Sequence, residues 1–454
     1  MLLNTFRYYL DASPRFWPRL VHVCHKWRRI VFASQRALRL RLFCTYGTPV
    51  LKTLDYWPAL PIVVEYGGSP ALDPPAPEDE DNILAALKRS DCVISIHLTI
   101  TMSLLAKLSS IKEPFSELED LVLLYEDCME LELPSAFRWG LRLRKLHSTG
   151  ISFPSPLQQL SSSRDVVDIQ LHNTVGVTYL SPEAFANALS GMTQLQSLSL
   201  QLYSSYPGQY RDNNIPPLSL ERAVLPALTR LRFRGVGEFF DRFMARIDPP
   251  LLRDIEITFI GRPFVASNLF KLIDRINAQK SYSRAELLFS DHVISASFTK
   301  PGDPMRPKLG ISAAFRPSKW QSFMIELCNH LATFLSGVED LRIHATRPSS
   351  GQDDMNCERW AKLIHPFRGT KWFHIAGDLS TDIVLSLQLS GERDEYLLPS
   401  LHKFCIREPE PHYVHLREAI VSLIASRWLS DHIIGVEYER LNEPRGKGET
   451  FVQR

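Results

Sequence analysis

A short apolar pattern recurs along this chain and constrains its fold more than any other feature. The pattern is an apolar residue, two variable residues, a second apolar residue, one variable residue and a third apolar residue. Two apolar side chains two positions apart lie on the same face of a β-strand, so each copy predicts a strand with one buried face. Full copies occur at Val93/Ile96/Leu98, Leu118/Leu121/Leu123, Val166/Ile169/Leu171, Leu195/Leu198/Leu200, Leu228/Leu231/Phe233, Leu252/Ile255/Ile257, Val338/Leu341/Ile343 and Leu401/Phe404/Ile406, and weaker ones at Leu143/Leu146 and Phe373/Ile375.

The segments between these copies have helical periodicity. Ser181-Pro182-Glu183 predicts the start of a helix, because serine caps helix N-termini and proline suits the first helical position. Apolar residues at helical spacing predict further helices over 239–247, 269–276, 320–334 and 416–424. Helices that alternate with strands predict an α/β fold, in which the strands run parallel and the chain forms a curved solenoid.

The spacing of the copies is typical of a repeat protein. In the first half of the chain their starting positions lie roughly 23 to 33 residues apart, and leucine-rich repeats have periods of roughly 20 to 29 residues. Residues 91–454 resemble a leucine-rich-repeat horseshoe, which implies strands on the inner face and helices outside. The asparagine of that family is replaced at the corresponding positions by Glu126, Ile151, Thr174 and Tyr203, so we expect an irregular leucine-rich-repeat-like solenoid.

Residues 1–45 have a different pattern. Trp17, Leu20, Cys24, Trp27 and Val31 alternate three and four positions apart, so on one helix they would form a continuous apolar stripe. The opposite side would be basic, with Arg19, His22, Lys26, Arg28 and Arg29. The pattern predicts a helical element that binds a protein partner. An alternative is a helical hairpin that only caps the segment that follows it.

The same segment resembles an F-box, a small helical module with a Val-Cys-x-x-Trp core. Leu2, Leu3, Phe6 and Leu10 match its first helix, Trp17 and Leu20 its second, and Val23, Cys24, Trp27 and Val31 its third. The resemblance implies an all-helical module that binds a Skp-type adaptor and, through it, a cullin. The predicted adaptor-binding residues are Leu3, Phe6, Leu10, Trp17, Leu20, Val23, Cys24 and Trp27.

Residues 46–90 read as a connecting segment. Trp57-Pro58 and Pro61 argue against a helix over residues 46–66, while Ile62-Val63-Val64 predicts a short strand. The acidic run Glu78 to Asp81 follows a segment rich in proline. It is either an acidic docking tail or the first turn of a helix, where carboxylates favour the helix dipole.

Three long insertions interrupt the repeats, at residues 203–219, 300–318 and 346–356. Their proline, glycine, serine and aspartate content predicts surface loops. The three tyrosines of the first insertion, Tyr203, Tyr206 and Tyr210, suggest either a binding loop or aromatic residues that fasten the loop to the scaffold.

Overall composition argues against several classes of protein. The 52 basic and 50 acidic residues give a formal charge of +2, which does not suit a general nucleic-acid binder. No apolar run is long enough to span a membrane, and the first residues do not resemble a secretory signal. The seven scattered cysteines are typical of reduced thiols in an intracellular protein, cytoplasmic or nuclear.

No motif for catalysis, a cofactor or a metal is present in the sequence. There is no phosphate-binding glycine loop, G-x-S-x-G, H-E-x-x-H or C-x-x-C motif, and His22 and His25 have only Cys24 nearby as a further metal ligand. The sequence therefore predicts a non-enzymatic subunit that recognises a target protein for a Skp/cullin/F-box-type ubiquitin ligase. Because the Leu-Pro opening of the family is absent before Leu2, a repeat scaffold uncoupled from ubiquitination is the second hypothesis. An enzyme with an unfamiliar site is a third.

Overall fold

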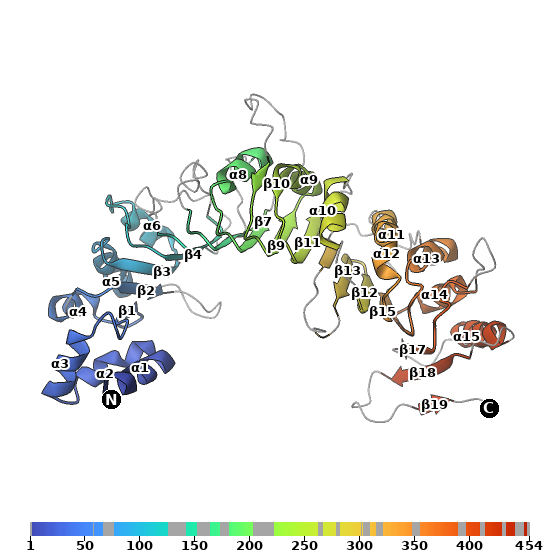
Figure 1. Ribbon diagram of the computed structural model, residues 1–454, viewed down its shortest axis with the longest axis horizontal. Helices are drawn as coiled ribbons and strands as arrows, with labels where there is room; N and C mark the ends of the chain where they lie inside the picture. Colours follow the sequence, from blue (N-terminus) through green and yellow to red (C-terminus); the bar gives the residue numbers. More distant parts are fainter. Residues whose placement is uncertain are drawn as a thin grey trace. The chain divides into compact units, whose positions relative to one another are not determined.

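The computed structural model (Figure 1) describes residues 2–57, 59–66, 77–125, 142–151, 164–172, 181–202, 222–261, 267–277, 282–300, 302, 309–314, 321–346, 355–388, 396–408, 414–428, 433–440 and 449–451. The chain divides into two compact units, residues 1–228 and 229–454. Both units are α/β, and most of their paired strands run parallel.

The first unit begins with helices and continues as strands joined by helices. Its helices are α1 (Leu2–Ala12), the short 3-10 helix η1 (Pro14–Phe16), α2 (Trp17–Val21), α3 (His25–Ala33), α4 (Val50–Tyr56), α5 (Pro77–Leu87), α6 (Met102–Leu108) and α8 (Pro182–Leu189). Its strands are β1 (Leu42–Thr45), β2 (Ile62–Tyr66), β3 (Val93–Thr99), β4 (Asp120–Leu124), β5 (Lys145–Thr149), β6 (Asp168–His172), β7 (Ser197–Gln201) and β8 (Ala223–Val224).

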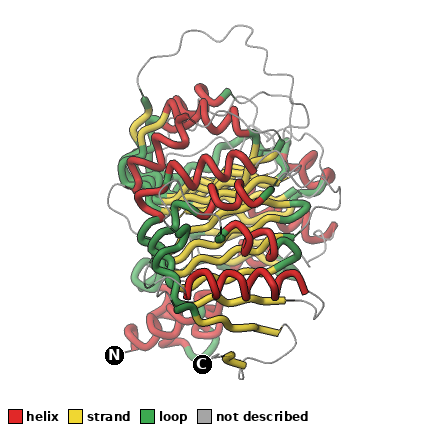
Figure 2. Tube along the Cα trace, turned by 90° about the vertical axis from the view of Figure 1, so that its right-hand side faces the viewer, coloured by secondary structure: helices red, strands yellow, loops and turns green. Residues whose placement is uncertain are grey.

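Strands β1 to β7 form one parallel ladder, in which each strand pairs with the next along the chain. Figure 2 draws the strands of the chain in yellow and shows them stacked side by side. In β4, β6 and β7 buried residues alternate with half-buried ones, and the predicted pairs of apolar residues, such as Leu121 and Leu123, are the buried members. The ladder begins at Leu42, well before residue 91, where the sequence places the first repeat.

The second unit repeats this arrangement. Its helices are α9 (Gly237–Arg246), α10 (Ser267–Asn277), α11 (Gln321–His330), α12 (Ala332–Leu335), α13 (Cys357–Ile364), α14 (Ser380–Ser386) and α15 (Val414–Trp428). Its strands are β9 (Arg230–Gly235), β10 (Ile247–Asp248), β11 (Asp254–Ile260), β12 (Arg284–Phe289), β13 (Val293–Thr299), β14 (Leu309–Ala314), β15 (Asp340–Ala345), β16 (Trp372–Ala376), β17 (Lys403–Glu408), β18 (Gly435–Arg440) and β19 (Glu449–Phe451).

An antiparallel insertion interrupts the parallel order of the second unit. Strand β13 pairs antiparallel with both β12 and β14, while β14 pairs parallel with β11 and β12 pairs parallel with β15. The expectation of a surface loop over residues 300–318 was therefore wrong for residues 309–314, which form β14. Strand β19 also pairs antiparallel, with β18, so not every strand is parallel as the repeat pattern predicted.

The same pair of backbone hydrogen bonds recurs at the start of several strands. Two consecutive backbone N–H groups donate to one carbonyl oxygen of the preceding repeat, as Arg144 and Lys145 do to Glu119. Lys371 and Trp372 donate to Glu339 in the same way in the second unit. This shared geometry shows that several of the irregular sequence repeats are equivalent in structure. Every strand that the apolar pattern predicted is present.

Some of the turns that follow strands use glycine. Gly150 has a φ of +73°, and a Cβ atom there would lie 2.3 Å from the carbonyl oxygen of Tyr125. Gly377 has a φ of +97°, and its Cβ would lie 2.2 Å from the carbonyl oxygen of Ala345. Only glycine fits such a close approach with positive φ, so at these two places backbone conformation makes a turn possible in the absence of the family's asparagine.

The acidic run lies in the first turn of α5, as one of the two sequence alternatives predicted. Glu80 is only 5% exposed and accepts hydrogen bonds from Thr101 Oγ1 (3.1 Å) and Ser103 Oγ (2.9 Å). Lys107 Nζ lies 2.9 Å from its carboxylate. The run therefore connects α5 to α6 and does not form a docking tail.

Helix predictions were mostly confirmed. Ser181 caps α8 by accepting a hydrogen bond from the backbone N–H of Ala184, and Pro182 is at the first helical position. Helices α9, α10, α11 and α15 lie where the sequence predicts them. The expectation that residues 46–66 contain no helix was wrong, because α4 begins directly after Pro49 and ends at Tyr56, before the Trp57-Pro58 pair. The predicted tyrosine-bearing loop, residues 203–219, lies outside the described residues.

Candidate interaction surfaces

The N-terminal segment is a bundle of short helices, and its helical character agrees with the apolar periodicity of the sequence. The prediction of one continuous helical stripe from Trp17 to Val31 was wrong, because α2 ends at Val21 and α3 begins at His25. Cys24 has extended backbone angles, with φ −160° and ψ 166°, and precedes the first turn of α3. The break places the side chains of α2 and α3 on two helices, which then pack against each other.

Half of the predicted adaptor-binding residues form the interior of this bundle. Phe6, Leu10, Trp17 and Leu20 are each at most 6% exposed. Phe6 also packs edge-to-face against Trp27, with the ring centroids 4.8 Å apart. Helical spacing could not separate these core residues from residues at the surface, because both kinds are large and apolar.

Trp17 fixes the bundle to the start of the parallel ladder. Its indole Nε1–H donates a 2.6 Å hydrogen bond to the carbonyl oxygen of Arg41, which directly precedes β1. Its ring packs edge-to-face on Trp57, with centroids 4.8 Å apart. Arg15 forms an ion pair with Glu65 of β2. The helices are thus anchored to the sheet of the first unit by packing, a hydrogen bond and an ion pair.

The remaining predicted residues are accessible to a partner. Val23 is 58% exposed and Cys24 is also exposed, whereas Leu3 and Trp27 are half-buried. Two aromatic residues that the sequence reasoning did not select are exposed as well, Tyr8 at 81% and Phe16 at 40%. The available apolar surface therefore centres on the turn between α2 and α3 and on the outer side of α1.

The N-terminal helices are also strongly basic, which the near-neutral charge of the whole chain concealed. Residues 2–41 contain nine basic residues and one acidic residue, Asp11, which leaves 43 basic and 49 acidic residues for the rest of the chain. A count of charge by segment would have found this excess of positive charge. The basic residues are Arg7, Arg15, Arg19, Lys26, Arg28, Arg29, Arg36, Arg39 and Arg41.

The strand face turned away from the core is a second candidate surface. In the first unit the strand register places His97, His147 and Gln170 in one row, and His172 beside His147. The rings of His147 and His172 lie 5.3 Å apart. Burial lowers the pKa of His147 from its usual value, an effect that Asp168 opposes and His97 reinforces.

The corresponding face of the second unit carries paired charges. Asp340 of β15 accepts from Arg284 Nε at 2.8 Å and from Arg342 Nη2 at 3.1 Å. Lys403 Nζ lies 2.6 Å from a carboxylate oxygen of Glu437, and this hydrogen bond raises the pKa of Lys403 and lowers that of Glu437. Such pairs leave a polar face with little net charge in this region.

The described residues do not assemble a reactive centre of a familiar kind. Burial raises the pKa of Cys44 and of Cys328 to about 12, so both thiols stay protonated and unreactive at neutral pH. Within the described ranges, no three His, Cys, Asp or Glu side chains lie together as metal ligands. No described helix has both the length and the apolar character needed to cross a membrane.

Comparison with known proteins finds likeness among solved structures only. The chain matches no protein-family model and no curated protein. Among solved structures it is similar to the leucine-rich-repeat-containing protein LegL7 from Legionella pneumophila, with 11% sequence identity and a TM-score of 0.28, over 85% of this chain and 97% of that one.

Proposed function

We propose that this chain is the substrate-recognition subunit of a Skp/cullin/F-box-type ubiquitin ligase. The observation that carries the proposal is a small helical bundle, anchored on the first strands of the ladder, whose Val23-Cys24 turn stays exposed next to the helix that holds Trp27. In this role the bundle binds a Skp-type adaptor, and a cullin joins through that adaptor. The open strand face holds the target protein.

The positive charge of the bundle indicates which kind of adaptor surface it would bind. A bundle with nine basic residues and one acidic residue attracts a partner with an acidic surface. Exposed apolar side chains at the centre of such a contact supply most of the affinity, while the surrounding charges mainly increase the rate of association. We therefore expect the affinity to fall as salt is added, because exposed charges are screened within about 8 Å at physiological ionic strength.

Val23 is the position at which to test this contact. Trp27 is less informative, because it packs on Phe6 and its truncation would also weaken the bundle. Val23→Asp places a charge on an exposed side chain and leaves the buried residues of the bundle intact. The matched control is Tyr56→Asp, which changes an 84% exposed residue of α4 in the same unit.

The experiment measures binding of the purified chain to a purified Skp-type adaptor by calorimetry. We expect Val23→Asp to weaken binding at least tenfold, which corresponds to about 1.4 kcal/mol, and Tyr56→Asp to bind like the unchanged chain. If the unchanged chain fails to bind while a protein with a complete F-box binds under the same conditions, the ligase role is wrong. The chain would then act as a repeat scaffold uncoupled from ubiquitination, the second candidate function.

A further inference from the structure

Helix α15 is apolar on two opposite sides. One side faces the core of the second unit, where Leu416, Ile420 and Leu423 are at most 2% exposed. On the other side Val414, Val421 and Trp428 are 64%, 65% and 71% exposed. These three residues are seven positions apart, so they form one line along the full length of the helix. We call this line, together with Ala425, the outer stripe.

Other helices of the second unit have the polar outer side that a solvent-exposed helix normally has. Lys271, Asp274 and Arg275 are exposed on α10, and Glu358 and Lys362 are exposed on α13. A helix with apolar residues on both sides is typical of one covered on both sides, and apolar residues that recur every seven positions are a pattern by which helices pair. The outer stripe therefore has the residue pattern of a surface that pairs with another helix.

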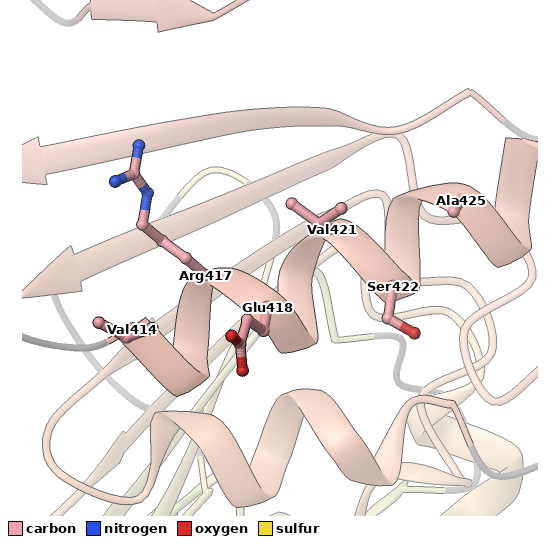
Figure 3. A pocket seen from close by; sticks show the side chains of 6 residues that line it. All are labelled: Val414, Arg417, Glu418, Val421, Ser422 and Ala425. Atoms are coloured by element: carbon pink, nitrogen blue, oxygen red, sulfur yellow. The ribbon is translucent and has the colours of Figure 1, made fainter.

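The residues along the outer stripe differ between its two halves. Figure 3 shows six side chains on this open side of α15: Val414, Arg417, Glu418, Val421, Ser422 and Ala425. The first half carries the long charged side chains Arg417 and Glu418, and the second half carries the small side chains Ser422 and Ala425. Val421 lies between the two halves.

We propose that the outer stripe binds the outer stripe of a second copy of this chain, with the two α15 helices antiparallel and Val421 at the two-fold axis. In this arrangement Val414 of each copy lies against Trp428 of the other. The long side chains Arg417 and Glu418 of each copy lie over Ser422 and Ala425 of the other, where there is space for them. The stripe is thus complementary to itself in size only when the helices run in opposite directions.

Charge favours a second copy over a charged partner. One cation, Arg417, and one anion, Glu418, lie on this side of α15, and His415 Nδ1 is 3.7 Å from Glu418. An anionic lipid surface or an acidic protein would require an excess of positive charge, which the outer stripe lacks. A helix of 15 residues is about 22 Å long. Two helices of this length bury less surface than the roughly 1,200–2,000 Å² that is typical of a stable interface. We therefore expect a dimer that dissociates at micromolar concentrations and responds little to salt.

Sedimentation of the full chain at protein concentrations from about 1 to 100 μM tests the interface. We expect a monomer–dimer equilibrium, and Val421→Glu should raise the dissociation constant at least tenfold. Val224→Glu is the matched control, because Val224 is 52% exposed and lies in the first unit. A chain that stays monomeric throughout this range, or a dimer that Val421→Glu leaves unchanged, would overturn the proposal.

Disulfide trapping tests the antiparallel geometry. In a Cys24→Ser background, Val421→Cys should form a disulfide with its counterpart under mild oxidation, because both residues lie at the axis. Val414→Cys should not, since two such residues would be about 21 Å apart and a disulfide requires Cα atoms within about 7 Å. A crosslink at position 414 without one at 421 would show that the helices do not pair in this way.

Discussion

Glu80 allows a sharp test of whether the acidic run stabilises the fold or binds a partner. Its carboxylate is almost fully buried and accepts hydrogen bonds from Thr101 and Ser103 at the beginning of α6, with Lys107 also in contact. Glu80→Gln keeps the size of the side chain and removes the charge. Because the amide can accept at only one of its two end atoms, at least one of these donors loses its acceptor.

The expected cost follows from these contacts. A hydrogen bond to a charged group contributes about 1.5–3 kcal/mol, and the ion pair with Lys107 adds little because the lysine side chain is 37% exposed. Since Gln keeps part of the bonding, we expect a loss of about 1–2 kcal/mol. The assay is hydrogen exchange of the amides of α6 in the full chain, where this loss corresponds to about 5- to 30-fold faster exchange if α6 opens locally.

The pH dependence gives an independent check. Burial alone would raise the pKa of Glu80, but the hydrogen bonds from Lys107, Ser103 and Thr101 outweigh it and hold the pKa below its usual value. The stabilisation is therefore complete above the unfolded-state pKa of about 4.3 and is lost as the pH falls through the lower folded-state value. Glu80→Gln should remove this dependence from α6, whereas Glu78→Gln, at an exposed position of the same turn, should preserve it. Equal exchange in the Glu80→Gln variant and the unchanged chain would refute the reasoning.

Two further predictions concern backbone conformation and thiol reactivity. Gly150→Ala should destabilise the first unit far more than Gly47→Ala, because both glycines have positive φ but only at Gly150 would the new Cβ collide with the backbone of Tyr125. Thermal unfolding measures the difference, and equal shifts for the two variants would contradict it. Cys24 should react with iodoacetamide at pH 8 while Cys328 does not, because Cys24 is exposed and burial holds the pKa of Cys328 at about 12. Mass spectrometry of the labelled peptides shows which thiols react, and rapid labelling of Cys328 in the folded chain would be inconsistent with that burial.

The repeat pattern was a reliable guide to the strands for a physical reason. A strand with one face against helices requires apolar residues two positions apart, and this requirement is local in the sequence. It therefore located strands such as β4 and β15, even though the repeats differ in length and lack the asparagine of the leucine-rich-repeat family. It missed β13 and β14, because an antiparallel insertion has no fixed spacing relative to the repeats.

The candidate interaction residues of the N-terminal helices were only partly separable from the sequence. The pattern identified Phe6, Trp17, Val23 and Trp27 as one apolar group with helical spacing. The packing of three helices against each other and against β1 decided that Phe6 and Trp17 are core, and that Val23 is at the surface. Long-range contacts, such as that between Trp17 and Trp57, determine which of these residues are buried. Helical spacing carries no information about such contacts.

By itself the sequence determined the alternation of helices and strands, the basic character of residues 2–41 and the absence of familiar catalytic motifs, because composition and local periodicity encode these properties. Tertiary structure alone decided that Glu80 of the acidic run bonds to residues of α6, that the β12–β14 insertion enters the sheet, and that the outer stripe of α15 is exposed. Each of these depends on which segments meet across many residues of chain. Apolar residues have the same pattern whether they face a core or a partner, so only the folded structure shows which ones are left to bind.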